Sequence, residues 1–205
     1  MSLNSVILAV EDALSDAVAT EILRSFDIEV HVRIPITYQG NTYLRKRAAE
    51  LNRSAKGPPY VFMFTDLDSP KRCVPELIQS WVKAPLNPGF FLRVAVMEIE
   101  SWVMADRGAL AAFLSIPVGR IPDVPDDILA PKEFLVSLAR GSKKKSLRDQ
   151  LVPSKRAMTA RVGPEYNSCL GQFVRDDWNL ERAAAVSPSL KRTLDRITLA
   201  KSVKN

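Results

Sequence analysis

The sequence predicts an α/β protein with a doubly wound, mainly parallel four-stranded sheet and a C-terminal helical extension. Up to about residue 115, short apolar runs alternate with stretches of helical periodicity, which is the order typical of a parallel sheet. The stretch "IPVGRIPDVPDDILAP" then holds four prolines in sixteen residues, and every periodic stretch beyond it is helical. We therefore expect an α/β core over residues 1–115, and a proline-rich loop with a basic helical extension packed on that core over residues 116–205.

Four runs have the length and the β-branched and aromatic composition of strands. They lie at 5–10, 28–35, 60–65 and 89–97. A stretch with the apolar spacing of a helix follows each strand, at 15–26, 41–54, 72–84 and 98–106. In the first of these helices we expect Ser15 or Asp16 at the N-cap. The alternation predicts helices on both faces of the sheet.

Composition argues against several classes of site. The chain has 205 residues, 46% of them hydrophobic and 25% charged, which is ordinary for a soluble domain with one core. No apolar run is long enough to span a membrane, so we expect a cytoplasmic protein. Cys73 and Cys169 are expected to be free, buried thiols. The single histidine, His31, lies in a strand-like stretch, which argues against a zinc centre or a His-dependent nucleophile.

The charges are distributed unevenly along the chain. Residues 1–139 hold 14 Lys and Arg against 17 Asp and Glu, a net charge of −3, whereas residues 140–205 hold 15 against 6, a net charge of +9. This asymmetry suits a protein that holds a polyanion near carboxylates, and the dense run Lys143, Lys144 and Lys145 is a candidate contact with nucleic acid. An ordinary solvated face of basic helices explains the same count, and composition leaves both interpretations open.

The stretch "YVFMFTDLDSP" (60–70) places Asp66 and Asp68 directly after a strand. Ligands of open α/β sheets bind at this end of the strands, and residues two apart in an extended segment point the same way. Paired carboxylate oxygens are ligands that Mg²⁺ prefers. The same pattern also suits a turn that caps the next helix, so the stretch alone leaves two interpretations.

Acidic residues also follow two other predicted strands. The first strand ends at Glu11 and Asp12, and the fourth ends at Glu98 and Glu100. Because the carboxyl ends of parallel strands share one edge of the sheet, these groups are expected to meet the two aspartates there. Such a cluster repels itself unless a cation or protons neutralise it. We therefore predict a Mg²⁺ or Mn²⁺ site, although each acid by itself also suits a helix cap.

Two stretches, "ILAVEDALSDAV" and "VFMFTDLDS", together resemble the Toprim domain of topoisomerases, bacterial primases, recombination proteins and OLD-type nucleases. In that family a Glu after the first strand and an Asp-x-Asp after a later strand form a metal-dependent phosphoryl-transfer site. The resemblance implies a Toprim-like fold, with Glu11 as the lone glutamate and Asp66 and Asp68 as the paired motif. Relatives often carry Gly after this Glu, where this chain has Asp12, so the role of Asp12 stays open.

Four further stretches, "RVAVMEIESWVMADR", "APKEFLVSLAR", "VGPEYN" and "SPSLKRTLDRI", are similar to parts of a Toprim-like bacterial family, the domain of unknown function 4276. The resemblance implies that Glu11 works as a general acid or base or holds a second ion, and that Lys132 stabilises charge at a scissile phosphate. Glu98 is favoured over Glu100 as a further metal ligand because it comes first after the strand. Trp102 is expected in the core.

Together these residues predict Mg²⁺- or Mn²⁺-dependent hydrolysis of phosphodiester bonds in DNA or RNA, in a system of the bacterial defence type. The chain is too short for a topoisomerase, which needs a separate domain with a nucleophilic tyrosine. One alternative is a catalytically silent or metal-binding module that serves as the partner of a separate ATPase. Another is a structural domain whose acidic residues only cap helices.

Overall fold

A four-stranded parallel sheet forms the centre of the computed structural model, which describes residues 3–35, 40–154 and 159–204. The strands are β1 (Ser5–Ala9), β2 (Glu29–Arg33), β3 (Tyr60–Asp66) and β4 (Phe90–Ala95). They lie in the order β2-β1-β3-β4, and every neighbouring pair is parallel. The predicted α/β class with a parallel four-stranded sheet is confirmed.

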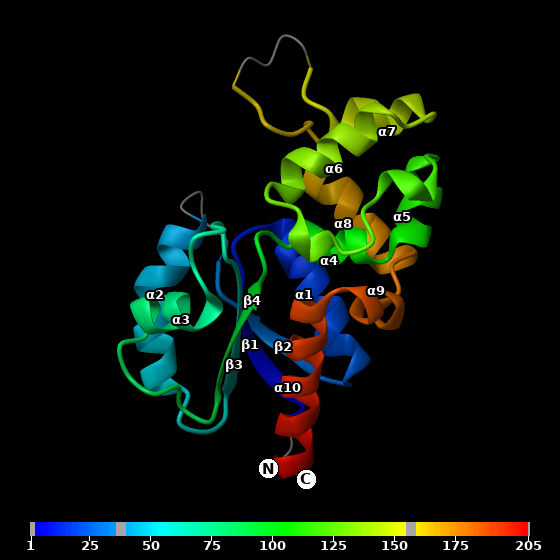
Figure 1. Cartoon of the computed structure of the whole chain (residues 1–205). Coiled ribbons are helices and arrows are strands. Elements are labelled where there is room, and N and C mark those ends of the chain that lie inside the picture. The colour runs from blue at the N-terminus through cyan, green and yellow to red at the C-terminus, as the bar shows by residue number, and fades with distance from the viewer. Residues whose placement is uncertain (1–2, 36–39, 155–158, 205) are drawn as a thin grey trace.

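Helices cover both faces of the sheet (Figure 1). One face packs against α1 (Ala13–Ser25) and α10 (Pro188–Lys204), and the other against α2 (Gly40–Ser54) and α3 (Val74–Trp81). Side chains alternate between the faces along each strand, so Phe62 and Phe91 face α1 and α10, whereas Met63 and Leu92 face α2 and α3. The sheet is therefore doubly wound, and β3 and β4 are buried almost throughout, whereas β2 is largely exposed.

The remaining helices form a layer beyond the carboxyl ends of the strands (Figure 1). These helices are α4 (Glu100–Ala105), α5 (Arg107–Leu114), α6 (Pro131–Arg140), α7 (Lys145–Leu151), α8 (Tyr166–Asp176) and α9 (Leu180–Val186). The proline-rich stretch contains two short 3₁₀ turns, η1 (Val118–Arg120) and η2 (Pro125–Asp127). α8 packs against α1, and a single hydrophobic cluster runs from the sheet into this layer.

Trp102 anchors the helical layer to α10. Its side chain is fully buried, and its indole N–H donates a hydrogen bond to Oγ of Ser189 at 2.6 Å. Its carbonyl oxygen accepts a hydrogen bond from the indole N–H of Trp178 at 3.2 Å. The prediction that Trp102 belongs to the core is confirmed, and both buried indole N–H groups find the partners that they need.

Two acids whose roles the sequence leaves open act as helix caps. Oδ1 of Asp12 accepts a hydrogen bond from the backbone N–H of Ser15 at 2.8 Å, so α1 begins before the residues expected to cap it and that prediction is wrong. Asp106 caps α5, and its carboxylate also lies 2.7 Å from Nη2 of Arg182. These contacts give both acids a structural role.

Three expectations about single residues or spans can be compared with the structure. Cys169 is a buried free thiol, as predicted, whereas Cys73 is exposed and the prediction for it is wrong. His31 lies exposed on β2, a strand at one edge of the sheet. Among the described residues, no helix combines the length and apolar character that crossing a membrane requires.

Candidate functional site

Glu11 and Asp66 meet where β1 and β3 end. In the parallel register Ala9 lies opposite Met63, so Glu11, two residues beyond Ala9, comes beside the end of β3. Oε1 of Glu11 accepts a hydrogen bond from the backbone N–H of Asp66 at 3.0 Å and another from the hydroxyl group of Thr65. The structure therefore brings together the lone glutamate and the first aspartate of the predicted pair.

Both carboxyl groups are pushed towards their neutral forms. Burial raises the pKa of Asp66 well above its usual range, and the charges of Glu11, Glu100 and Asp68 raise it further, while Lys132 acts in the opposite direction. Burial also raises the pKa of Glu11, although its hydrogen bonds oppose this shift. Acids that raise one another's pKa form a cluster that a proton or a cation stabilises.

Asp68 lies beyond β3, where the backbone turns away from the strand. Its φ of 54° falls in the left-handed region, which Asp tolerates better than most residues. Its backbone N–H donates to the carbonyl oxygen of Met97 at 2.9 Å, and Nδ2 of Asn41 donates to its Oδ2 at 3.0 Å. The expectation that Asp66 and Asp68 share one extended segment is therefore wrong, because β3 ends at Asp66 and Asp68 itself is left-handed.

Met97, after β4, also has a left-handed φ, of 62°. Such a conformation costs free energy in a residue with a long side chain and persists only where the surrounding contacts impose it. The hydrogen bond between Asp68 and Met97 joins the two strained loops after β3 and β4. Strained backbone of this kind is concentrated at functional sites, which marks this edge of the sheet as a candidate.

Glu98 and Glu100 occupy different surroundings although they are two residues apart. Oε2 of Glu98 accepts a hydrogen bond from the backbone N–H of Lys132 at 2.7 Å, in the first turn of α6. The Glu100 side chain is fully buried, with Oε1 3.4 Å from Nζ of Lys132 and 3.2 Å from the hydroxyl group of Tyr166, which donates to it. Lys132 is thus held at this edge through both its backbone and its ammonium group.

Burial shifts the pKa of Glu100 upwards by more than the ammonium group of Lys132 shifts it back. Burial raises the pKa of Glu100 to about 7, although the nearby ammonium group of Lys132 lowers it. Burial lowers the pKa of Lys132, but the carboxylates around it, with Glu100 first, outweigh burial and raise the pKa above its ordinary value. Lys132 therefore stays charged at neutral pH. Oε2 of Glu100 is buried and has no hydrogen-bond partner among the described residues.

Tyr166 is a member of this network that the sequence alone did not assign to it. The turn that delivers it depends on Gly163, because a Cβ there would lie 2.2 Å from the carbonyl oxygen of Gln150. Burial and the carboxylate of Glu100 raise the pKa of the Tyr166 hydroxyl group well above its usual value. Tyr166 is therefore a neutral hydrogen-bond donor to Glu100. The only sequence signal for it was the stretch "VGPEYN", which the resemblance singled out.

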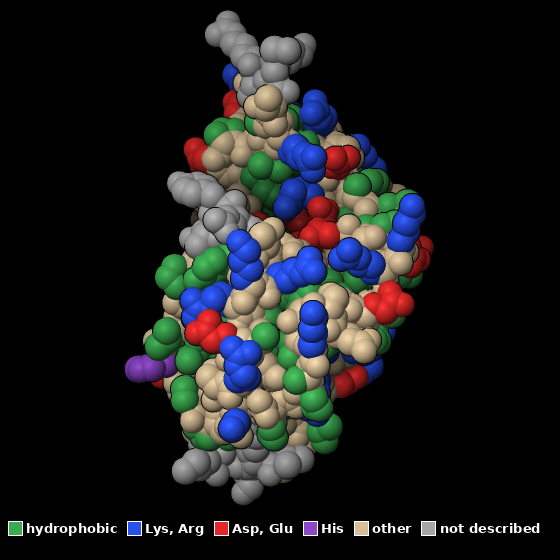
Figure 2. Space-filling model, turned by 90° about the vertical axis from the view of Figure 1, so that its left-hand side faces the viewer, with side chains coloured by type: hydrophobic (Ala, Val, Ile, Leu, Met, Phe, Trp, Pro, Cys, Tyr) green, Lys and Arg blue, Asp and Glu red, His purple; other side chains and the backbone are tan. Residues whose placement is uncertain are grey.

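A small pocket of about 180 Å³ opens at this edge, and its lining includes Asp68, Glu98, Lys132 and Arg161. Figure 2 shows Asp and Glu side chains in a hollow that is bordered by Lys and Arg side chains. The pocket therefore places carboxylates next to two cationic side chains. Sequence patterns did not single out Arg161, because it follows no strand and belongs to no dense basic run.

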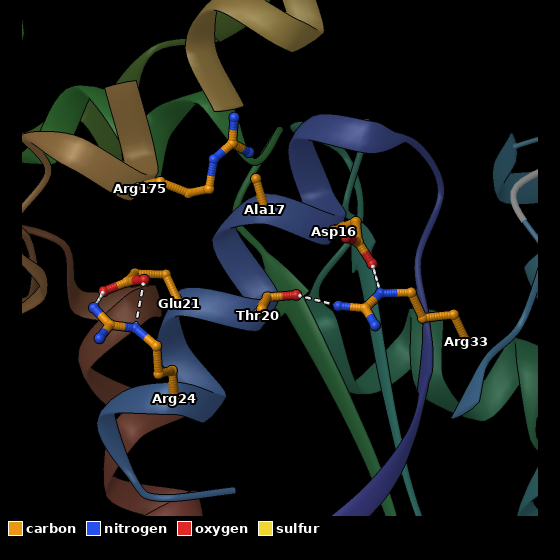
Figure 3. A pocket seen from close by; sticks show the side chains of 7 residues that line it. All are labelled: Asp16, Ala17, Thr20, Glu21, Arg24, Arg33 and Arg175. Carbon is orange, nitrogen blue, oxygen red and sulfur yellow. Dashed lines mark hydrogen bonds and ion pairs between the residues drawn. The ribbon is translucent and has the colours of Figure 1, made fainter. Parts of the chain in front are cut away.

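A second pocket, of about 430 Å³, lies beside α1 (Figure 3). Arg33 lies 2.9 Å from the carboxylate of Asp16, and Arg24 lies 2.5 Å from that of Glu21. Four of the five charged side chains that line this pocket, all except Arg175, are thus paired with one another, so it offers less unbalanced charge than the carboxylate cluster at the sheet edge. The edge of the sheet is therefore the better candidate for a site that carries out chemistry.

The lysine run lies on the helical layer. Lys143, Lys144 and Lys145 are exposed, and α7, which Lys145 begins, lies above α6 on the side away from the sheet (Figure 1). Nζ of Lys144 donates a hydrogen bond to the carbonyl oxygen of Phe113 at 2.9 Å, so this lysine is partly held against the surface. Contact of the run with nucleic acid stays a prediction.

The donor chemistry of the edge suits a hard divalent cation. Three carboxyl groups there, those of Glu11, Asp66 and Glu100, have raised pKa values, and an oxygen of Glu100 is buried without a partner among the described residues. Among residues 3–35, 40–154 and 159–204, however, no group of three or more His, Cys, Asp or Glu side chains is arranged to hold a metal ion. Binding of Mg²⁺ or Mn²⁺ therefore stays a prediction.

No protein-family model, no curated protein and no solved structure matches the chain. The resemblance to the Toprim domain accordingly stays a prediction from the sequence. The site is characterised by its own residues and their contacts.

Proposed function

We propose that the chain is a Mg²⁺- or Mn²⁺-dependent phosphodiesterase that hydrolyses nucleic acid at the carboxyl edge of its sheet. The observation that carries this proposal is the 3.0 Å hydrogen bond from the backbone N–H of Asp66 to Glu11, which joins the turn after β1 to the end of β3. Asp68 raises the pKa of both Glu11 and Asp66, so the three acids interact electrostatically. A cluster of this kind, bordered by cations, suits the handling of a phosphate group.

In this proposal Glu11, Asp66, Asp68 and Glu98 hold the ion. A bound divalent ion supplies a water of lowered pKa and neutralises charge on a phosphate oxygen. The raised pKa of Glu11 suits a group that takes up or gives back a proton during the reaction.

The two cations that line the pocket supply fixed positive charge. Lys132 is held through its ammonium group by Glu100 and through its backbone by Glu98, so its charge is already in place before a phosphate arrives. Arg161 lines the same pocket, and its planar guanidinium group can donate hydrogen bonds to two oxygens of one phosphate group. Glu100 and Tyr166 position Lys132 from within the protein.

The test is cleavage of supercoiled plasmid and of single-stranded substrates with Mg²⁺ or Mn²⁺, comparing wild type with Asp66→Asn. We expect Asp66→Asn to abolish metal-dependent cleavage without loss of fold. The variant is expected to be as stable as wild type or more stable, because it removes a buried charge that its neighbours repel. Asp177→Asn, at an exposed acid far from the strand ends in sequence, is the matched control and should cleave like wild type.

The second candidate is a catalytically silent module that partners a separate ATPase, as in multi-part bacterial defence systems. The observation that favours its silent form is that the described residues include no group of three metal-ligating side chains. The silent form predicts no cleavage and no effect of Mn²⁺ on the melting temperature, whereas the metal-binding form predicts that Mn²⁺ raises the melting temperature of wild type but not of Asp66→Asn, with no cleavage in either. Wild type that binds Mn²⁺ and cuts nothing, alone or with a candidate ATPase, would contradict the phosphodiesterase proposal.

A further inference from the structure

Three arginines converge where α10 lies against β4. Arg93 lies on β4 between Phe91 and Ala95, whose side chains belong to the cluster on the α10 face of the sheet, so Arg93 points to the same face. Arg192 and Arg196 are exposed and lie one turn apart on α10. The guanidinium carbon of Arg196 lies 5.9 Å from the centre of the Phe91 ring, which holds this arginine against the sheet.

These arginines have no acidic partner in the part of the chain that the structure describes. Arg93, Arg192 and Arg196 form none of the ion pairs within that part of the chain. The acid nearest to them on α10, Asp195, lies 3.1 Å from Nζ of Lys191. Nε of Arg93 is buried without a hydrogen-bond partner among the described residues. Three like charges are therefore gathered without compensation.

The grouping has an electrostatic cost. Burial, followed by the positive charges of Arg196 and Arg192, lowers the pKa of Arg93 to about 10. The pKa of an arginine side chain seldom falls this far, and a downward shift means that the charged form of the side chain is destabilised. A negatively charged ligand bound between the three side chains would offset that repulsion.

We propose that Arg93, Arg192 and Arg196 form a binding site for phosphate groups, and that the backbone of a nucleic acid supplies them. Guanidinium groups recognise phosphate through paired hydrogen bonds and are weakly hydrated, so a partly buried arginine cluster suits a phosphate group. The choice of nucleic acid as the source rests on the phosphodiesterase activity proposed above.

The position of the three arginines suits a nucleic-acid strand that also reaches the acidic edge, which is the carboxyl end of the sheet where Glu11, Asp66 and Glu100 lie. The hydrogen bond between Trp102 and Ser189 fixes the first turn of α10 beside α4, the helix that begins with Glu100. From there α10 runs along the sheet past β4 (Figure 1), so Arg192 and Arg196 follow within the next two turns of the helix. A nucleic acid held by Arg192 and Arg196 would therefore lead towards the pocket that Lys132 lines.

The experiment measures binding of short fluorescein-labelled single- and double-stranded oligonucleotides by fluorescence anisotropy in EDTA. We expect the double variant Arg192→Ala/Arg196→Ala to raise Kd about tenfold or more, and to reduce the slope of log affinity against log salt by about 1.5, because two phosphate contacts are lost. Both residues are exposed, so the fold should be kept, as circular dichroism would verify. Arg53→Ala, at an exposed arginine on α2, is the matched control and should leave Kd and slope unchanged.

The outcomes separate the ligand from the chemistry. An unchanged Kd and salt slope in the double variant would overturn the proposal. Calorimetric binding of inorganic phosphate to wild type, lost in the double variant and without any oligonucleotide binding, would support the phosphate site and assign it to a small phosphate compound. The binding assay contains EDTA, which removes divalent ions, so it measures binding separately from metal-dependent cleavage. If the arginines bind oligonucleotides but the protein cleaves none when Mg²⁺ or Mn²⁺ is supplied, only the phosphodiesterase proposal is contradicted.

Discussion

Oε1 of Glu100 lies 3.4 Å from Nζ of Lys132 at the acidic edge of the sheet, and the Glu100 side chain is fully buried. Despite this cation, burial dominates and raises the pKa of Glu100 to about 7. The pair therefore contains an acid that is partly protonated at neutral pH. Stability and charge at the site are both expected to depend on pH.

The free energy of unfolding should fall as pH rises from about 4.5 to about 7 and then level off. In this window the folded state holds a proton on Glu100 that the unfolded state has released, so raising the pH favours unfolding. The raised pKa values of Glu11 and Asp66 act with the same sign. For Glu100 alone the change is up to roughly 3 kcal/mol. Urea unfolding at about pH 5 and about pH 8 measures it.

Glu100→Gln should remove most of this pH dependence, because an amide has no proton to lose in the window. Glu29→Gln is the control, since Glu29 is exposed on the edge strand β2. If Glu100→Gln kept the full pH dependence of wild type, the effect would belong to other groups.

Lys132→Met should destabilise the protein by about 2 kcal/mol at about pH 8, because it leaves a buried carboxylate without its cation. The loss should be smaller at about pH 5, where Glu100 is protonated. In combination with Glu100→Gln, the cost of Lys132→Met should also shrink, which a double-mutant cycle measures as a coupling energy. Equal costs in both backgrounds would mean that the 3.4 Å contact contributes no net free energy.

Asp12→Ala should cost about 1 kcal/mol, because it removes the N-cap of α1, whereas Asp12→Asn should cost only a few tenths since Asn caps equally well. Thermal unfolding with and without Mn²⁺ tests this difference. The two variants should respond to Mn²⁺ like wild type. A loss of the Mn²⁺ response in Asp12→Asn would instead make Asp12 a metal ligand.

Replacing Lys143, Lys144 and Lys145 together by Ala should flatten the salt dependence of nucleic-acid binding, since each neutralised phosphate releases counterions. The oligonucleotide assay in EDTA measures this slope. The hydrogen bond from Lys144 to the carbonyl oxygen of Phe113 would be lost as well, at a cost of about 1 kcal/mol of stability. A slope equal to that of wild type would assign the run to ordinary solvated surface.

Local pattern predicted the types of the elements better than their surroundings. The stretch 28–35 was expected to be a strand with alternating apolar residues, yet β2 covers Glu29–Arg33 and is largely exposed. Packing of the helices decides this, because both β2 and β4 lie at an edge of the sheet, but only β4 is buried in the hydrophobic clusters on both faces. The helix expected at 72–84 is shorter, Val74–Trp81, since Val82 is already extended. Strand order and helix ends depend on packing across the chain, which periodicity does not encode.

The sequence by itself determined that acids follow three strands of a parallel sheet, because alternation of strands and helices sends all those strand ends to one edge. Only the tertiary structure decided which acids meet there. The register of β1 against β3 places Glu11 beside Asp66, and α6 and α8 bring Lys132 and Tyr166 to Glu100. The physical reason is that a strand's period of two decides which face a side chain occupies, whereas its partners and its desolvation depend on residues far away in the sequence.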